Sequence, residues 1–284
     1  MFSFRRDQFR AMLLSLLITD ALCHQQISSG TQRFCVDKSS TSHCEAGFHQ
    51  ALTSDRWSHA LTHSLDYLVR TPPATPAFLD KQSQTLKQTC DRVETVAEVV
   101  LVILPVFLQS LDNPRIGQRW HNQVPSSWQK ATLVYYEWLL ALLEPDINHT
   151  TKHHRPSNAS DAYSETDAVI ANAIRHHRQA DGSFPLAVGC SYRFADEQPG
   201  LPILSGLLSA SQVGSKGIPI AWQQALQNPK PKLKEWLEQR WRISSATIVD
   251  TWADALFHHW LGQHQPFLSG NTDLMLTAIR PRRR

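Results

Sequence analysis

Two apolar stretches decide the fold of this chain: QFRAMLLSLLITDALC at residues 8–23 and GLLSASQVG at residues 206–214. Each places a small residue at every fourth position: Ala11, Ser15, Thr19 and Cys23 in the first, and Gly206, Ala210 and Gly214 in the second. Residues four apart lie on the same face of a helix, and a row of small side chains leaves a groove in which a neighbouring helix packs closely. The two stretches therefore predict the crowded centre of an all-α domain.

Length and composition are those of an ordinary globular protein. The chain has 284 residues, of which 42% are hydrophobic and 19% are charged, and this length allows a large core. We expect a single domain over residues 1–284. A net charge of +3 is too small to indicate a nucleic-acid partner. The basic tail RPRRR at residues 280–284 is interpreted as a solvated terminus.

The cysteines favour a reducing compartment. Their number is odd and no C-x-x-C pair occurs among the five, so neither a disulfide framework nor a cysteine-rich zinc site is expected. We therefore predict a cytoplasmic protein. No apolar run reaches the roughly 18–20 residues that a membrane-spanning helix needs, and we expect no membrane span.

The N-terminal stretch has a second interpretation. Two arginines precede the apolar run, as in a secretory signal peptide, and cleavage before Cys23 would leave a lipid-anchored protein. Asp7, Arg10 and Asp20 interrupt that pattern. Helix packing already explains the small residues, so we favour a helix of the mature fold.

Helical spacing of apolar residues continues along most of the chain. It predicts helices over 55–69, 93–110, 127–143, 164–179, 185–194, 201–213, 219–227, 231–241 and 245–262. The segment 93–110 is rich in β-branched residues, which also suits a buried strand. Its length favours a buried helix that Pro105 kinks or ends. Residues 71–77 are predicted to form a rigid connector, and residues 145–162 a polar loop.

Segment 8–23 resembles the opening helix of the ADP-ribosylglycohydrolase family, which reads approximately R-F-R-G-A-L-L-G-L-A-x-G-D-A-L-G. The matching residues are Phe9, Arg10, Leu13, Leu14, Leu16, Asp20, Ala21 and Leu22. The stretch 206–222 is similar to the family's G-A-L-x-G-A-x-x-G…I-P-x-x-W run. The resemblance implies a compact orthogonal multi-helix bundle of the ADP-ribosylglycohydrolase type.

Members of this family cleave the glycosidic bond between ADP-ribose and its acceptor with two divalent cations, usually Mg²⁺. Such ions prefer carboxylate ligands, and two neighbouring ions need several of them. The family supplies these ligands from an early T-D-D-T motif and a later D-T-D-T motif. Counting back from Gly206 places the later motif on EQPG at 197–200, and the early motif is best placed on SDRW at 54–57.

Only Asp55 and Glu197 keep a carboxylate at these placements, and Arg56 puts a cation where an anion is expected. The resemblance therefore implies a degenerate member with a degraded two-metal site and little or no glycohydrolase activity. Such a protein would act as a binding or regulatory protein, with an unidentified protein partner or an ADP-ribose-like ligand. The alternative is an active hydrolase with a reduced site, in which Asp55 and Glu197 hold Mg²⁺.

Structural roles remain open for the same residues. Asp20 matches the family pattern, yet an aspartate near a helix end is also typical of structural hydrogen bonding. Asp55 would favour the dipole of a helix capped by Ser54, and Glu197 suits a surface loop. His59 and His63 share one helix face and could bind a transition metal, although a third ligand is not evident. No catalytic residue is assigned.

Overall fold

The computed structural model describes residues 2–24, 55–70, 88, 93–111, 124–143 and 168–261, and the regular structure of these residues is helical. The α-helices are α1 (Phe2–Cys23), α2 (Arg56–Arg70), α4 (Val96–Ser110), α6 (Ser126–Leu143), α7 (Ala168–Gln179), α8 (Phe184–Tyr192), α9 (Leu201–Val213), α10 (Ile220–Gln227), α11 (Pro231–Arg240) and α12 (Ile248–Trp260), with a 3₁₀ turn η5 (Ser215–Gly217). The all-α prediction is confirmed for this part of the chain. The predicted connector 71–77, polar loop 145–162 and basic tail 280–284 lie outside the described residues.

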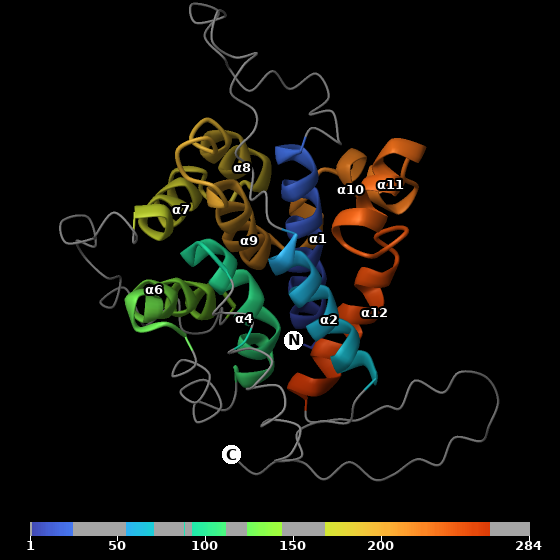
Figure 1. Ribbon diagram of the computed structural model, residues 1–284, viewed down its shortest axis with the longest axis horizontal. Coiled ribbons are helices and arrows are strands. Elements are labelled where there is room, and N and C mark those ends of the chain that lie inside the picture. Colours follow the sequence, from blue (N-terminus) through green and yellow to red (C-terminus); the bar gives the residue numbers. More distant parts are fainter. Residues whose placement is uncertain are drawn as a thin grey trace, which may run out of the picture.

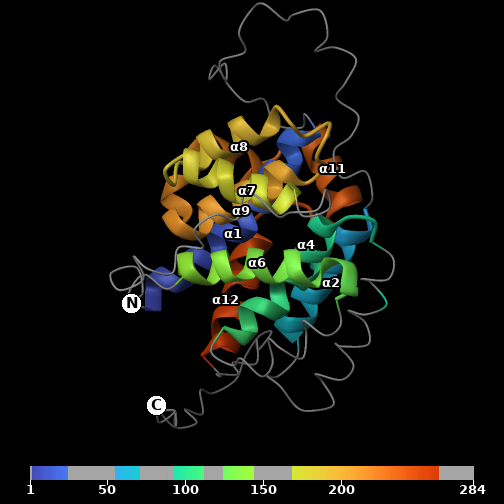
Figure 2. The same cartoon turned by 90° about the vertical axis from the view of Figure 1, so that its left-hand side faces the viewer.

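Helix α1 is the centre of the fold. Figure 1 shows it between α8 and α9 on one side and α10 to α12 on the other, and α9 and α12 are its main packing partners. Figures 1 and 2 show helices running in several directions rather than as one parallel bundle. Residues 11–22 of α1 are buried. A helix that is apolar on all sides is stable in water only when other elements surround it, which explains its place.

The two rows of small residues lie against each other where α1 meets α9. A β-carbon added at Gly206 would lie 2.9 Å from Thr19 Oγ1 and 3.1 Å from Val188 Cγ2. The hydroxyl of Thr19 donates to the carbonyl of Ser15 (2.6 Å) within α1, so this polar atom is satisfied without a partner from α9. The absence of a side chain at Gly206 thus permits the close approach of the two helices.

The apolar segment near residue 100 is a helix and not a strand. Thr95 caps α4 through a capping box: Thr95 Oγ1 accepts the Glu98 N–H (3.2 Å), and Glu98 Oε2 accepts the Thr95 N–H (3.1 Å). The helix does not end at Pro105 but continues to Ser110, and the Gln109 side chain donates to the Pro105 carbonyl (3.1 Å). The prediction of a buried helix is confirmed.

No helix among the described residues is both long enough and apolar enough to cross a membrane.

Candidate functional site

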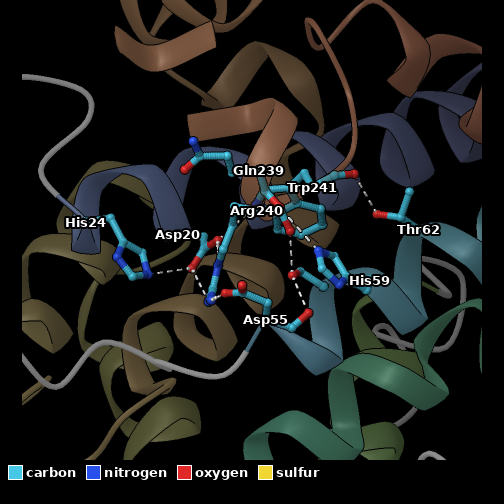
Figure 3. A network of polar contacts seen from close by, with 9 residues as sticks. Asp20, His24, Asp55, His59, Thr62, Gln239, Arg240 and Trp241 are labelled. Atoms are coloured by element: carbon cyan, nitrogen blue, oxygen red, sulfur yellow. Dashed lines mark hydrogen bonds and ion pairs between the residues drawn. The ribbon is translucent and has the colours of Figure 1, made fainter. Parts of the chain in front are cut away.

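Three helix ends meet beside the C-terminal turns of α1. Figure 3 shows Asp20 from α1, Asp55 from the start of α2 and Arg240 from the end of α11 converging on one point. Asp20 lies in the last turn of α1, and Asp55 directly precedes α2. Helix α11 begins with a proline, which is favourable at the first helical position, and its last residue is Arg240. We call this group, together with Trp241 and His24, the Asp20 network.

Arg240 and Asp20 form a buried ion pair. The guanidinium donates from Nε to Asp20 Oδ2 (3.1 Å) and from Nη2 to Asp20 Oδ1 (3.2 Å). The indole Nε1 of Trp241 also donates to Asp20 Oδ2 (2.8 Å). The side chains of Asp20 and Arg240 are 0% and 4% exposed. Bidentate pairs of this kind are strong and directional, and burial makes each charge depend on the other.

Asp55 contacts the outer side of the same guanidinium. Arg240 Nη1 donates to Asp55 Oδ1 (2.8 Å), and the Asp55 side chain is 57% exposed. The carbonyl of Asp55 accepts the His59 N–H (3.0 Å), which is the first hydrogen bond of α2. The guanidinium lies 5.3 Å from the centre of the Trp57 ring, a distance suited to a cation–π contact. One cation is thus shared by a buried carboxylate and an exposed one.

Side chains of α2 satisfy the last carbonyls of α11. Ser58 Oγ donates to Arg240 O (2.7 Å), His59 Nε2 to Gln239 O (3.2 Å) and Thr62 Oγ1 to Trp241 O (3.2 Å). Helix ends leave such carbonyls without a partner inside the helix. These bonds fix the end of α11 against α2 and hold the Arg240 backbone in place. His63, the predicted companion of His59, is exposed on α2.

The electrostatics of the Asp20 network follow from burial. Burial lowers the pKa of Arg240, but Asp20 and Asp55 more than offset this effect and the pKa is raised overall. His24 Nε2 lies 3.6 Å from Asp20 Oδ1; burial lowers the pKa of His24 more than Asp20 raises it, so the imidazole is neutral at pH 7. Burial, with a smaller effect of Asp20, raises the pKa of the Cys23 thiol, which is therefore a poor nucleophile.

The structure brings together two of the three predicted site residues. Asp20 and Asp55 both contact Arg240, whereas Glu197 is exposed in the turn that leads from α8 to α9. In this turn Gly200 has φ +89° directly before α9, a conformation that favours glycine. Gly200 therefore has a structural role at a position where the family motif has a threonine.

Sequence reasoning missed Arg240 and Trp241. Neither stands out in the EQRWRIS segment at 238–244, because a basic residue at a helix end is ordinary. The available signal was Asp20 itself, since a carboxylate inside an apolar helix that is buried must find a partner. Burial of Asp20 thus predicts a partner but does not identify it.

The described residues do not fit a pair of magnesium ions. No group of three or more His, Cys, Asp or Glu side chains in these segments is arranged to hold a metal ion. The guanidinium of Arg240 is already within 2.8–3.2 Å of oxygens of both Asp20 and Asp55. A divalent cation would compete with this fixed positive charge for the same oxygens.

Comparison of the chain with family models, with curated proteins and with solved structures finds no match. The resemblance to the ADP-ribosylglycohydrolase family is therefore confined to the sequence segments 8–23 and 206–222 and the two motif placements.

Proposed function

We propose that this protein is an ADP-ribosylglycohydrolase-like helical protein with a degraded two-metal site, and that it acts as a binding or regulatory protein with little or no glycohydrolase activity. The observation that carries the proposal is the position of Arg240. Its guanidinium binds Asp20, which matches the family's first helix, and Asp55, which falls on the best placement of the early metal motif.

The charge balance supports a site without metal. Two carboxylates and one guanidinium leave a net charge of −1, with His24 neutral. Two divalent cations bring four positive charges, which require several more oxygen ligands. At a separation of 4 Å, like unit charges near a protein surface repel by about 4 kcal/mol for each pair. Divalent cations could therefore bind Asp20 and Asp55 only by displacing the Arg240 guanidinium, which is already bonded to both.

The test is release of ADP-ribose from a protein that is mono-ADP-ribosylated on arginine, with excess Mg²⁺ or Mn²⁺. We expect no release above background from the wild-type protein, and the same result for Asp55→Ala. Cooperative thermal unfolding of both proteins shows that they are folded. Metal-dependent release that disappears in Asp55→Ala and on addition of a chelator would overturn the proposal and favour the alternative, a reduced site that uses Asp55 and Glu197.

A second measurement concerns the partner. If the ligand is ADP-ribose-like, free ADP-ribose raises the unfolding temperature in the absence of divalent cations, because a ligand that binds only the folded state stabilises it. No change at millimolar ADP-ribose would indicate a protein partner instead.

We also propose a cytoplasmic protein that retains its N-terminal helix. The support is the position of residues 11–22 in the centre of the core, since removal of that helix would expose the apolar faces of α9 and α12. Intact-mass measurement of the protein purified from its native source tests this. A mass that corresponds to cleavage before Cys23 would favour the exported, lipid-anchored alternative.

A further inference from the structure

We propose that α7 (Ala168–Gln179) is an acid-released cover of α9: protonation of His176 and His177, two adjacent buried residues, detaches α7 from the core and exposes the apolar side of α9 against which it packs. The inference goes beyond the proposed function and does not depend on it, because neither histidine belongs to the Asp20 network. Release of ADP-ribose and the exchange measurement described below therefore test different properties of the protein.

Helix α7 lies at the periphery of the fold. Figure 1 shows it on the outer left of the molecule, with α9 between α7 and α1, and α7 packs against α9, α8 and α6. Figure 2 views this side of the molecule. Helix α9 is buried from Leu201 to Ser211. Loss of α7 would uncover apolar surface on α9 while the contact between α9 and α1 remains.

The two histidines are buried with few acceptors around them. His176 is 5% exposed and His177 is 4% exposed. The Nδ1 atom of His177 lies 3.0 Å from Ser209 Oγ on α9. The ring of His176 stacks on Phe194, with 5.4 Å between the ring centres, and neither of its nitrogens has a hydrogen-bond partner among the described residues. A protonated imidazole carries two N–H donors and a full charge, which these surroundings do not satisfy.

The elements around α7 supply no countercharge to either histidine. Helix α9 has no titratable side chain, and α8 has only Cys190 and Tyr192. Helix α7 itself adds two exposed arginines. The other titratable groups of the neighbouring elements are Lys130, Tyr135, Tyr136 and Glu137 on α6, and Arg193, Asp196 and Glu197 in the turn that carries Phe194. Burial, with a smaller effect of Arg175, lowers the pKa of His176, and burial lowers the pKa of His177 to about 4; no carboxylate contributes to either shift.

The direction of the pH effect follows from this burial. In packed α7 both imidazoles are neutral, whereas in released α7 they are in water and bind protons below a pH of about 6.5. The packed form is therefore fully favoured above pH 6.5 and loses stability as the pH falls. Each histidine shifts the equilibrium toward release by up to about tenfold per pH unit, and the two together by up to about 100-fold. His24, in contrast, lies 3.6 Å from the carboxylate of Asp20, so a proton at the end of α1 has a countercharge.

The test is amide hydrogen exchange of the full-length protein between pH 7.5 and pH 5, followed by mass spectrometry and corrected for the pH dependence of the intrinsic exchange rate. We expect the protection of α7 to fall by at least about tenfold between pH 7 and pH 5, while the protection of α1 and α9 falls much less, because a peripheral helix can open without global unfolding. The double variant His176→Leu with His177→Gln removes both titrating groups, and its α7 protection should not depend on pH. The matched control is His63→Gln, at an exposed histidine of α2, which should follow the wild type.

Three outcomes would overturn the proposal. The first is an equal loss of protection in α7 and α1, which would indicate global unfolding by acid. The second is unchanged protection of α7 in the wild type down to pH 5. The third is the same pH dependence in the double variant as in the wild type. If the double variant does not fold, the comparison of α7 with α1 in the wild type and in His177→Gln still decides, because removal of one histidine should halve the logarithm of the change in α7 protection.

Discussion

Both ends of α1 are held by pairs of aspartate and arginine, but the two ends differ in burial. At the N-terminal end, Arg6 pairs with Asp254 and Arg10 with Asp250, both on α12, and all four side chains are partly exposed. At the C-terminal end, Asp20 is fully buried against Arg240. Exposed pairs are screened by water, whereas each member of a buried pair needs the other to offset its loss of hydration. The exposed ion pairs therefore stabilise the N-terminal end of α1 only weakly. At the C-terminal end, loss of either partner of the buried pair should be strongly destabilising.

The largest effect is expected from Arg240→Met. This change leaves the carboxylate of Asp20 buried without its cation, and among the described residues only the Trp241 indole still donates to it. We expect a loss of about 3–5 kcal/mol in the free energy of unfolding, measured by urea denaturation. The double variant Asp20→Asn with Arg240→Met removes both charges and should recover part of that loss. If the double variant is destabilised by the sum of the two single changes, the pair is not coupled.

The free energy of unfolding should depend on pH through His177, a buried histidine whose pKa is shifted by burial. Burial lowers the pKa of His177 to about 4, and its Nδ1 lies 3.0 Å from Ser209 Oγ. The imidazole is neutral in the folded protein, while the unfolded chain binds a proton below a pH of about 6.5. Stability from this group is therefore complete above pH 6.5 and falls as the pH decreases toward 4, by about 3 kcal/mol.

Urea denaturation between pH 7 and pH 4.5 measures this effect. His177→Gln should show a weaker loss of stability over this range than the wild type, whereas His63→Gln, a change at an exposed histidine of α2, should follow the wild type. Parallel pH profiles for the wild type and His177→Gln would contradict the prediction.

The contact between α1 and α9 depends on packing rather than on charge. In Gly206→Ala the new methyl group would lie 2.9 Å from Thr19 Oγ1, so α1 and α9 must separate slightly. We expect a loss of about 1–3 kcal/mol in the free energy of unfolding. In a Thr19→Ala background the same change should be less harmful, because that contact is relieved; Val188 then accounts for the remainder. Additive losses would show that Thr19 is not the limiting contact.

The smallest effect is expected at the exposed end of α1. Asp254→Asn removes the partner of Arg6, whose side chain is 48% exposed. We expect a loss below about 1 kcal/mol, which decreases further in high salt because the contact is screened. A loss as large as that of Arg240→Met would remove the distinction between the two ends of the helix.

The sequence predicted the features that depend on local spacing. The rows that contain Thr19 and Gly206 indicated where two helices approach closely, because a four-residue period is visible in any helix. The length of the apolar segment at 93–110 correctly favoured a helix over a strand. For Pro105 the sequence predicted either a kink or the end of the helix. The second of these is wrong, because α4 continues to Ser110.

The candidate site was only half predictable. Asp20 was singled out from its match to the family pattern, and Asp55 from the placement of a degraded motif. Arg240 was not found, because it lies 220 residues from Asp20 in the chain and no local period connects the two. Glu197 was assigned by counting along the motif, but counting cannot establish whether two loops converge. Contacts between distant segments depend on the path of the whole chain, which local patterns do not encode.

The pairing of α1 with Arg240 also bears on how the protein is made. Asp20 leaves the ribosome 220 residues before its cation, an interval of roughly 10–45 s at ordinary rates of synthesis. During that time α1 carries an uncompensated carboxylate in its apolar C-terminal half. It lacks α12 throughout and lacks α9 until residue 213, and these two helices are its main packing partners. Among the described helices, α1 is thus synthesised before the others, but its packing is complete only when α12 has been made. We expect nascent chains that stop before residue 240 to need a chaperone, even though they already contain most of the core.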